Sequence, residues 1–307
     1  MDGILNIYKE AGYTSHDVVA KLRGILHQKK IGHTGTLDPE ATGVLPVCIG
    51  KATKVCELLA DRDKTYQAVC RLGIVTDTQD MTGTVLEESS FRDVSEERLR
   101  ETVLSFLGES FQIPPMYSAL KVEGKKLYEL AREGKTVKRE PRRIFISSIE
   151  ILQIDLEDGI FMFEVSCSKG TYIRTLCHDI GQRLGVGAVM ESLVRIRVGE
   201  FLVENAFTLE KIENFANENP EELEKNLYSI DMLFKHYPKF RIKDEFNAKL
   251  YNGNILGKNS MMPYPSSEEN EMSGAEKFQK ILLYDSNGMF KAIYEQAGHQ
   301  YKVVKMF

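Results

Sequence analysis

Apolar and polar positions recur with two different periods along the first 200 residues of the chain. Alternation typical of strands marks three segments, 64–75, 144–154 and 159–167. Helical spacing predicts three helices, over residues 15–30, 95–107 and 172–184, the first opened by a Ser/Asp capping signal. Because strands and helices are mixed without a regular βαβ rhythm, we expect an α+β fold built on a mixed, largely antiparallel sheet with flanking helices.

Residues 31–50 follow neither period, because six turn-forming residues interrupt them: Gly32, Gly35, Pro39, Gly43, Pro46 and Gly50. This punctuation predicts a loop followed by a short buried strand over residues 44–49. Within the loop, Asp38 precedes Pro39, which biases it towards an extended or turn conformation. A carboxylate held over a rigid strand suits catalysis, although an isolated Asp-Pro pair is most often only a turn.

The last quarter of the chain has a different organisation. Short strand-like runs at 239–242, 281–284, 290–294 and 301–304 are separated by glycines, which predicts a small β-barrel or sandwich. The acidic, Asn-rich stretch 213–226 is predicted to be a solvent-facing connection, and residues 259–275 a flexible loop. We therefore expect two domains, residues 1–235 and 236–307.

Composition excludes several classes of protein. With 42% hydrophobic and 28% charged residues, the chain is typical of a folded globular protein. No apolar run approaches the ~20 residues of a membrane span, and the first residues lack the pattern of a secretory signal. Five cysteines without a C-x-x-C pair indicate reduced thiols and make a zinc site unexpected. We expect a cytoplasmic protein.

The charge distribution is uneven. A net charge of −5 argues against a polyanionic partner, yet residues 121–143 carry nine Lys and Arg against four Glu. A local basic surface binds phosphates even on an acidic molecule. Solvated helix faces explain the same pattern equally well, so charge alone does not decide between them.

The segment 32–54, GHTGTLDPEATGVLPVCIGKATK, resembles the signature of the bacterial tRNA pseudouridine-55 synthases, G-H-T-G-x-L-D-P-x-A-T-G. Three further segments match that family in the same order: DKTYQA at 63–68, IPPMYSALKVEGKKLYELAREG at 113–134 and CSKGTYIRTL at 167–176. Two patterns depart from the family. The N-terminal K-P-x-G-x-[ST]-S lacks its proline at residues 9–15, and the later L-R-R reads Leu193-Val194-Arg195.

The resemblance implies that the chain isomerises uridine 55 of the tRNA T loop. The reaction breaks the glycosidic bond of the uridine, turns the free base and rejoins it through C5, which requires a carboxylate but no cofactor and no metal. The resemblance assigns this carboxylate to Asp38, its ion-pair partner to Arg174 and the stacking aromatic ring to Tyr66. Addition to C6, attack on C1′ and removal of a ribose proton all remain open as the role of Asp38.

The resemblance also implies RNA contacts. The target base must be extruded at a cost of a few kcal/mol. His33 resembles the histidine that enters the vacated space, while Tyr172 and Leu193 would line the base pocket. The candidates for phosphate contact are Lys9, Lys64, Lys121, Lys125 and Lys126, the last three on an insertion of about 117–145 that closes over RNA in this family. The C-terminal region resembles the RNA-binding barrel called PUA.

Two alternatives stay open at this point. In the first, the chain is a non-catalytic RNA-binding protein or tRNA-folding chaperone, with Asp38 only a turn residue. In the second, it is a related synthase with another uridine target. The presence of both Asp38 and Arg174 favours an enzyme, because a pure binder gains nothing from a carboxylate near a phosphate backbone. Asp77 and Asp80 are rival carboxylates, interpreted as structural or RNA-contacting because neither lies in the Gly-rich motif. We expect tRNA, through its T stem-loop, as partner, and neither a membrane nor a protein partner.

Overall fold

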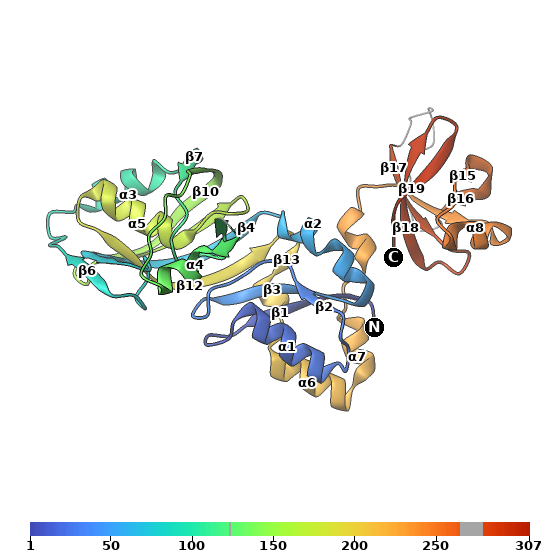
Figure 1. Cartoon of the computed structure of the whole chain (residues 1–307), viewed down its shortest axis with the longest axis horizontal. Helices are drawn as coiled ribbons and strands as arrows, with labels where there is room; N and C mark the ends of the chain where they lie inside the picture. The colour runs from blue at the N-terminus through green and yellow to red at the C-terminus, as the bar shows by residue number, and fades with distance from the viewer. Residues whose placement is uncertain (123, 265–278) are drawn as a thin grey trace.

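The computed structural model describes residues 1–122, 124–264 and 279–307. Figure 1 shows an elongated molecule in which a large sheet with its helices occupies most of the length and a smaller C-terminal part stands at one end. The large sheet has nine strands with the central order β1-β3-β12-β4-β11-β10-β7, while β2 and β13 pair with β3 and β12. Among the described residues, the pairing of β12 with β3 is the only parallel one in this sheet. The expected α+β class, with a mixed and largely antiparallel sheet, is confirmed.

The strands of this sheet are β1 (Gly3–Lys9), β2 (Ile31–His33), β3 (Thr42–Ile49), β4 (Lys64–Leu72), β7 (Gly108–Gln112), β10 (Arg142–Asp155), β11 (Ile160–Cys167), β12 (Ala188–Val198) and β13 (Phe201–Leu202). Next to β4, a hairpin of β5 (Ile74–Thr76) and β6 (Val85–Glu88) forms a separate two-stranded sheet. The parallel approach of β3 to β12 requires Gly43, because a Cβ there would lie 2.2 Å from the carbonyl oxygen of Arg195.

Helices α3 (Glu96–Leu104) and α5 (Ile173–Leu184) cover one face of the half of the sheet formed by β4, β11 and β10. Alternate residues of β4 and β11 point into this core, as the predicted period of two requires. Ser95 caps α3, and Gly185 ends α5 in a left-handed conformation with φ of 76°. Ile173 and Leu176 in the first turn of α5 share this core with residues of β4 and β12, where the site described below is built.

Three helices pack against the other half of the sheet, around β1 and β3 (Figure 1): α1 (Ser15–Ile25), α6 (Leu209–Glu218) and α7 (Pro220–Lys225). Thr14 and Asp17 form the capping box of α1, which ends five residues earlier than predicted. The stretch 213–226, predicted to be a solvent-facing connection, is mostly exposed but is helical, because it forms the end of α6 and all of α7. Leu223 within it, and Ile212 just before it, are buried against the β1–β3 core although acidic residues surround them in sequence.

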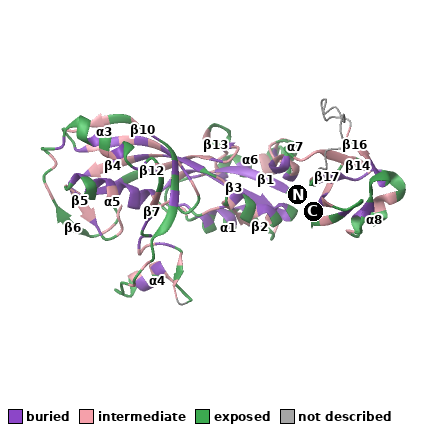
Figure 2. Ribbon diagram, turned by 90° about the horizontal axis from the view of Figure 1, so that it is seen from above, coloured by how far each residue is buried: buried purple, intermediate pink, exposed green. Residues whose placement is uncertain are grey.

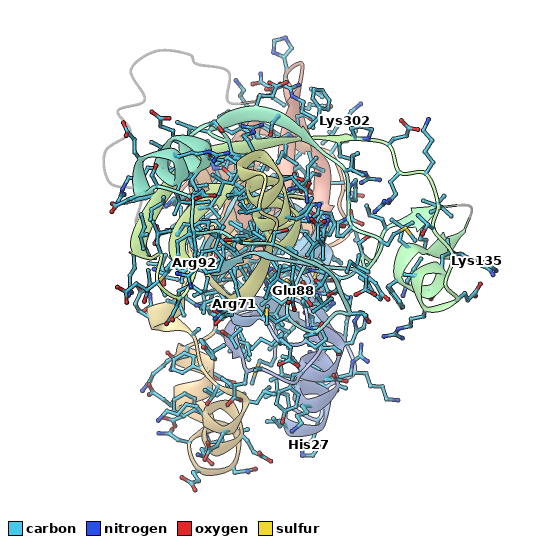
Figure 3. All side chains as sticks on the ribbon, turned by 90° about the vertical axis from the view of Figure 1, so that its left-hand side faces the viewer. His27, Arg71, Glu88, Arg92, Lys135 and Lys302 are labelled. Carbon is cyan, nitrogen blue, oxygen red and sulfur yellow. The ribbon has the colours of Figure 1, made fainter. Side chains whose placement is uncertain are left out.

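A small lobe interrupts the chain between β7 and β10. It contains a hairpin of β8 (Lys121–Val122) and β9 (Lys125–Lys126), followed by α4 (Leu127–Arg132). Figure 2 shows α4 away from the large sheet, and Figure 3 shows Lys135 on the part of the lobe that stands out from the body. The basic insertion predicted at about 117–145 overlaps this lobe.

The C-terminal part is a second, six-stranded sheet with the order β15-β19-β18-β17-β14-β16. Its elements are β14 (Lys239–Ile242), α8 (Asn247–Tyr251), β15 (Leu256–Gly257), β16 (Met261–Pro263), β17 (Lys280–Tyr284), β18 (Phe290–Ala297) and β19 (Gln300–Met306). The four predicted strands are present. The prediction of a flexible loop over 259–275 is wrong for β16, which pairs with β14, and residues 265–275 lie outside the described residues.

Short helices complete the chain: α2 (Cys56–Ala60) and the 3-10 helices 50–55, 203–205, 230–234, 244–246 and 258–260. The helix at 230–234 joins the two parts, because Leu233 and Phe234 share one apolar cluster with Tyr284 and Phe307 of the second sheet. The predicted domain boundary near residue 236 falls between this helix and β14. In the described residues, no helix is long and apolar enough to cross a lipid bilayer.

Candidate active site

Asp38 lies on the loop between β2 and β3, and neighbouring segments hold this loop in place. The backbone N–H of Leu37 donates to the buried hydroxyl of Ser15 at the start of α1, at 3.0 Å. On the other side of Asp38, the carbonyl of Pro39 accepts from the Lys9 ammonium at 2.8 Å and from the Gly12 N–H at 3.0 Å. The Asp38 side chain is 40% exposed. The carboxylate is therefore anchored at its base and open to an incoming molecule.

Arg174 comes from the first turn of α5 and has a side chain only 6% exposed. Its Nε lies 2.9 Å from Oδ2 of Asp38, and its Nη2 donates to Oδ1 at 3.2 Å. Backbone carbonyls take its other hydrogen bonds, that of Thr78 at 3.0 Å and that of Tyr117 at 2.8 Å. The structure brings the two residues together in a two-point contact that orients both carboxylate oxygens.

Two opposing effects act on the Asp38 carboxyl. Burial raises its pKa above the ordinary value, because the surrounding protein disfavours the charged form, and the nearby Asp80 carboxylate adds to the rise. The Arg174 guanidinium opposes both by attracting the negative charge. The site thus contains a partly desolvated carboxylate whose negative charge is favoured mainly by Arg174 and to a smaller extent by Lys9.

Apolar and aromatic side chains surround this pair. Tyr66 of β4 is 8% exposed and packs in the same core cluster as Leu37 and Leu193. Burial raises the pKa of its hydroxyl, and the positive charge of the nearby Arg195 opposes this rise. Tyr172, the N-cap of α5, is half-buried, and the Gln112 side chain bonds both its N–H (2.8 Å) and its carbonyl (3.0 Å). These contacts bring all three predicted pocket residues close to the Asp38 loop or to the start of α5.

His33 ends β2 and is half-buried, four residues before Leu37 on the same loop. Its Nδ1 accepts from the N–H of Gly35 at 3.3 Å, and its ring meets that of His16 edge to face at 5.0 Å. Burial lowers the pKa of His33, which favours the neutral ring. A neutral, partly packed ring next to the carboxylate loop is compatible with stacking on a base.

Comparison with known proteins adds the family. Residues 23–173 match the TruB family pseudouridylate synthase (N terminal domain), and residues 174–235 match the tRNA pseudouridylate synthase B C-terminal domain. A tRNA pseudouridine synthase B of Lachnoclostridium phytofermentans is 49% identical over 316 residues, covering 100% of both chains. One of Clostridium perfringens is 44% identical and covers 100% of this chain and 99% of its own. The chain belongs to the TruB family of pseudouridylate synthases.

Solved structures agree with membership of the TruB family. A chain of an H/ACA RNP bound to a substrate RNA containing 2'-deoxyuridine superimposes with a TM-score of 0.69 at 28% identity, covering 99% of this chain and 84% of that one. A chain of a Cbf5-Nop10-Gar1 complex gives 0.69 at 29% identity with the same coverage. Asp38 lies in the segment that matches the N-terminal family domain, and Arg174 is the first residue of the segment that matches the C-terminal one. Their contact therefore links the two matched segments.

Two lysines predicted to contact RNA are placed elsewhere by the structure. Lys9 is fully buried and its ammonium donates to the carbonyls of Glu10 and Pro39. Lys64 is buried and donates to the carbonyls of Ala60 and Arg62, both at 2.6 Å. Burial lowers the pKa of each to about 8. Phosphate contact is therefore not supported for these two, whose charges brace loop carbonyls instead.

The other three lysines lie on the hairpin of the insertion. The Lys125 side chain is 59% exposed, with its ammonium 3.8 Å from a Glu133 carboxylate oxygen, and Lys126 donates to the Tyr128 hydroxyl at 3.1 Å. Lys121 is exposed and pairs with Lys126 across the hairpin. These weak partners leave the ammonium groups available to a polyanion.

Sequence reasoning underrated two residues of the site. The Asp80 Oδ2 lies 3.5 Å from Nη1 of Arg174, so the T-D-T-Q-D turn supplies a second carboxylate to the same guanidinium. Arg195, noted only as a remnant of the L-R-R pattern, is buried behind the Asp38 loop. Asp77 instead accepts from the Tyr117 hydroxyl at 3.3 Å and does not reach Arg174.

A cavity of about 480 Å³ opens at a different place, between β7 and the outer side of α5, where Gln112, Asp179 and Arg183 line it. Asp38 is not among its lining residues, so this cavity is separate from the carboxylate site. Within the described ranges, no cluster of three or more His, Cys, Asp or Glu has the arrangement of a metal site.

Proposed function

We propose that this chain converts uridine 55 in the T loop of tRNA to pseudouridine, with Asp38 as the essential carboxylate. The observation that carries the proposal is the two-point contact of the exposed Asp38 carboxylate with the buried Arg174 guanidinium. The choice of tRNA is supported by relatives of 41–49% identity that are named tRNA pseudouridine synthase B. Such an enzyme works in the cytoplasm, where its substrate is.

The reaction conserves every atom of the uridine. The C1′–N1 bond breaks, the base turns, a C1′–C5 bond forms, C5 loses its proton and N1 gains one. The protein must therefore hold base and sugar beside an ionised carboxylate, with no electron transfer. Arg174 orients the Asp38 oxygens and offsets the burial that raises the pKa of this carboxyl. Each role open to Asp38, at C6, at C1′ or at a ribose proton, needs this ionised and oriented group.

The surroundings of Asp38 suit a base taken out of its stack. The Tyr66 ring provides a stacking face, worth roughly 1–3 kcal/mol for a base, and Leu193 and Tyr172 form apolar walls beside it. His33, held in this structure by Gly35 and His16, is proposed to enter the space that the base leaves in the T loop. These contacts would repay the few kcal/mol of base extrusion.

The insertion is proposed to bind the T stem-loop backbone through Lys121, Lys125 and Lys126. It also touches the site, since the carbonyl of Tyr117, at the start of the insertion, accepts from Arg174 at 2.8 Å. RNA that moves the β8–β9 hairpin towards the large sheet would therefore move backbone next to Arg174, the residue that orients Asp38. We propose that the C-terminal sheet is PUA-like, and we expect it to contact parts of the tRNA that lie away from the T loop.

The test is to incubate the purified protein with unmodified tRNA and to map pseudouridine at single-nucleotide resolution. We expect one new pseudouridine, at position 55, and none in a tRNA with cytidine there or with the Asp38→Asn variant. Tight binding without modification would instead indicate a tRNA-binding protein or chaperone. Modification at another uridine would indicate a synthase with a different target.

A further inference from the structure

Arg195 is one of the largest fully buried side chains, with 1% of its surface exposed. An ion pair with a carboxylate would ordinarily explain such burial, but Arg195 forms none in the part of the chain that the structure describes. Its guanidinium bonds oxygen atoms instead. Nε donates to the carbonyl of Val44 at 2.7 Å, and the two Nη atoms lie 3.5 and 3.4 Å from the carbonyls of Thr36 and Gly35. Tyr66 stands opposite Arg195 on the neighbouring strand, and the nearby guanidinium favours the charged form of its hydroxyl.

These oxygens come from three places around the site. Gly35 and Thr36 belong to the loop that carries Asp38, and Val44 belongs to β3, which follows it. Tyr66 stands directly opposite Arg195 in the antiparallel pairing of β4 with β12. In addition, the backbone of Arg195 meets that of Gly43 so closely that no Cβ fits there. One guanidinium therefore joins the strand of the stacking ring to the loop of the carboxylate.

A charge buried without a carboxylate is unfavourable unless fixed dipoles stabilise it. Arginine stays protonated in proteins and presents donors in a rigid planar fork. Moving the Asp38 loop away from Tyr66 would leave some of these donors unpaired in the core. The buried charge therefore opposes any change in the distance between the Asp38 loop and the Tyr66 ring. An apolar side chain of the same volume would not oppose it in this way.

We propose that Arg195 is a positioning residue for the isomerisation, setting the Tyr66 ring and the Asp38 loop at the separation that a bound uracil requires. The proposal rests on the proposed function. It distinguishes Arg195 from Arg174, which touches the carboxylate itself. A residue that only stabilises the fold would change the thermal midpoint but not the rate within a saturated complex.

The test separates binding from chemistry. For Arg195→Lys, which keeps the charge but loses the planar fork, we expect single-turnover rates at saturating tRNA to fall roughly 10²-fold, the effect of about 1 Å of misplacement. Affinity for tRNA should be unchanged. The matched control is Arg197→Lys on the same strand, because Arg197 donates to the Thr65 hydroxyl at 2.9 Å and contacts no part of the Asp38 loop. Its rate should equal that of the wild type.

Tyr66→Phe supplies a second variant that keeps the ring and its volume, in case Arg195→Lys does not fold. It should also slow the saturated complex without weakening tRNA binding, and the effects of the two substitutions should be less than additive in the double variant. A wild-type rate in either single variant, or strictly additive effects, would overturn the role of Arg195. Because wild-type turnover is measured in the same assay, absence of pseudouridine there would instead reject the proposed function.

Discussion

Asp38 and Arg174 are separated by 136 residues in the chain, yet their side chains are in contact. Nε of Arg174 lies 2.9 Å from Oδ2 of Asp38, and its Nη2 lies 3.2 Å from Oδ1. Arg174 reaches this contact from a buried position, with its remaining hydrogen bonds to the carbonyls of Thr78 and Tyr117. The orientation of the carboxylate therefore depends on three segments: the start of α5, the turn after β5 and the start of the insertion.

Asp38→Asn should remove detectable isomerisation while leaving tRNA affinity and folding nearly intact. The amide has the shape of the carboxylate but not its charge, and Arg174 keeps its two carbonyl partners and Asp80 in the variant. The measurements are pseudouridine mapping, a binding titration and thermal unfolding. Residual turnover close to that of the wild type would remove Asp38 from the chemistry.

Arg174→Lys should be severely impaired, by at least ~10²-fold in single-turnover rate, although the positive charge is kept. An ammonium is a point donor and does not span both carboxylate oxygens while also bonding two carbonyls. One unpaired buried carbonyl is expected to lower the free energy of unfolding by ~1–3 kcal/mol. Rate and unfolding are measured on the same preparation. Normal turnover would show that the two-point contact is not needed.

Local patterns predicted much of this fold correctly. Strands β4, β10 and β11 were visible because their alternation is set by one buried face. The helices at 209–225 were missed because each turns only a few apolar residues inward, and the sequence around Ile212 and Leu223 reads as acidic and polar. Burial of a narrow helical stripe depends on what the rest of the chain places beside it, and local composition does not show this.

The site was predictable only in part, for a related reason. Resemblance to a family paired Asp38 with Arg174, but no spacing rule brings residues so far apart in sequence together. The resemblance makes Lys9 and Lys64 candidates for phosphate contact, but it does not show whether their side chains face solvent. In the structure, both ammonium groups bond carbonyls of tight turns in the interior. Likewise, Asp80 reaches Arg174 only through the folding of the β5–β6 hairpin.

The pH dependence of turnover should reveal the environment of Asp38. Its folded pKa is raised by burial, so the acid limb of the single-turnover rate should lie above the ~3.9 of a free aspartate. Asp80→Asn removes a like charge and leaves Arg174 freer to attract Asp38. Both effects lower this pKa, so the limb should move to lower pH.

The control for this experiment is Asp77→Asn, because Asp77 bonds Tyr117 and Thr84 and not Arg174. Its acid limb should stay in place. The same raised pKa has a consequence for folding: the stability it contributes is fully present below the unfolded pKa and is lost as pH rises through the folded value. An acid limb that stays put or rises in Asp80→Asn would contradict the proposed electrostatics.

Charge reversal at Lys125 and Lys126 should weaken tRNA binding and flatten its dependence on salt. Each lost phosphate contact lowers the slope of log affinity against log salt by roughly 0.7–0.9. The control reverses Lys211 and Lys225, two exposed lysines on α6 and α7, with the same change in net charge. Binding titrations at several salt concentrations compare the two variants. If the salt slopes of the two variants are equal, the insertion does not contact RNA phosphates.

Removal of the C-terminal sheet should separate gripping of tRNA from chemistry. Every candidate site residue lies before residue 200, so a chain ending near residue 235 should still modify an isolated T-arm stem-loop but bind whole tRNA more weakly.

The structure adds a second effect of this truncation. It strips Tyr284 and Phe307 from the apolar cluster around Phe234, and the hydrogen bond of the Lys54 ammonium to the Met306 carbonyl is lost. The thermal midpoint should therefore fall, and the stem-loop assay must be run below it. Because exposed Phe234 would complicate the result, Phe307→Ser in the full-length chain serves as the control that weakens the same cluster while keeping the sheet. A truncated chain that is folded by circular dichroism yet leaves the stem-loop unmodified would show that the C-terminal sheet helps to build the active site, since loss of grip on distant parts of tRNA does not affect so small a substrate.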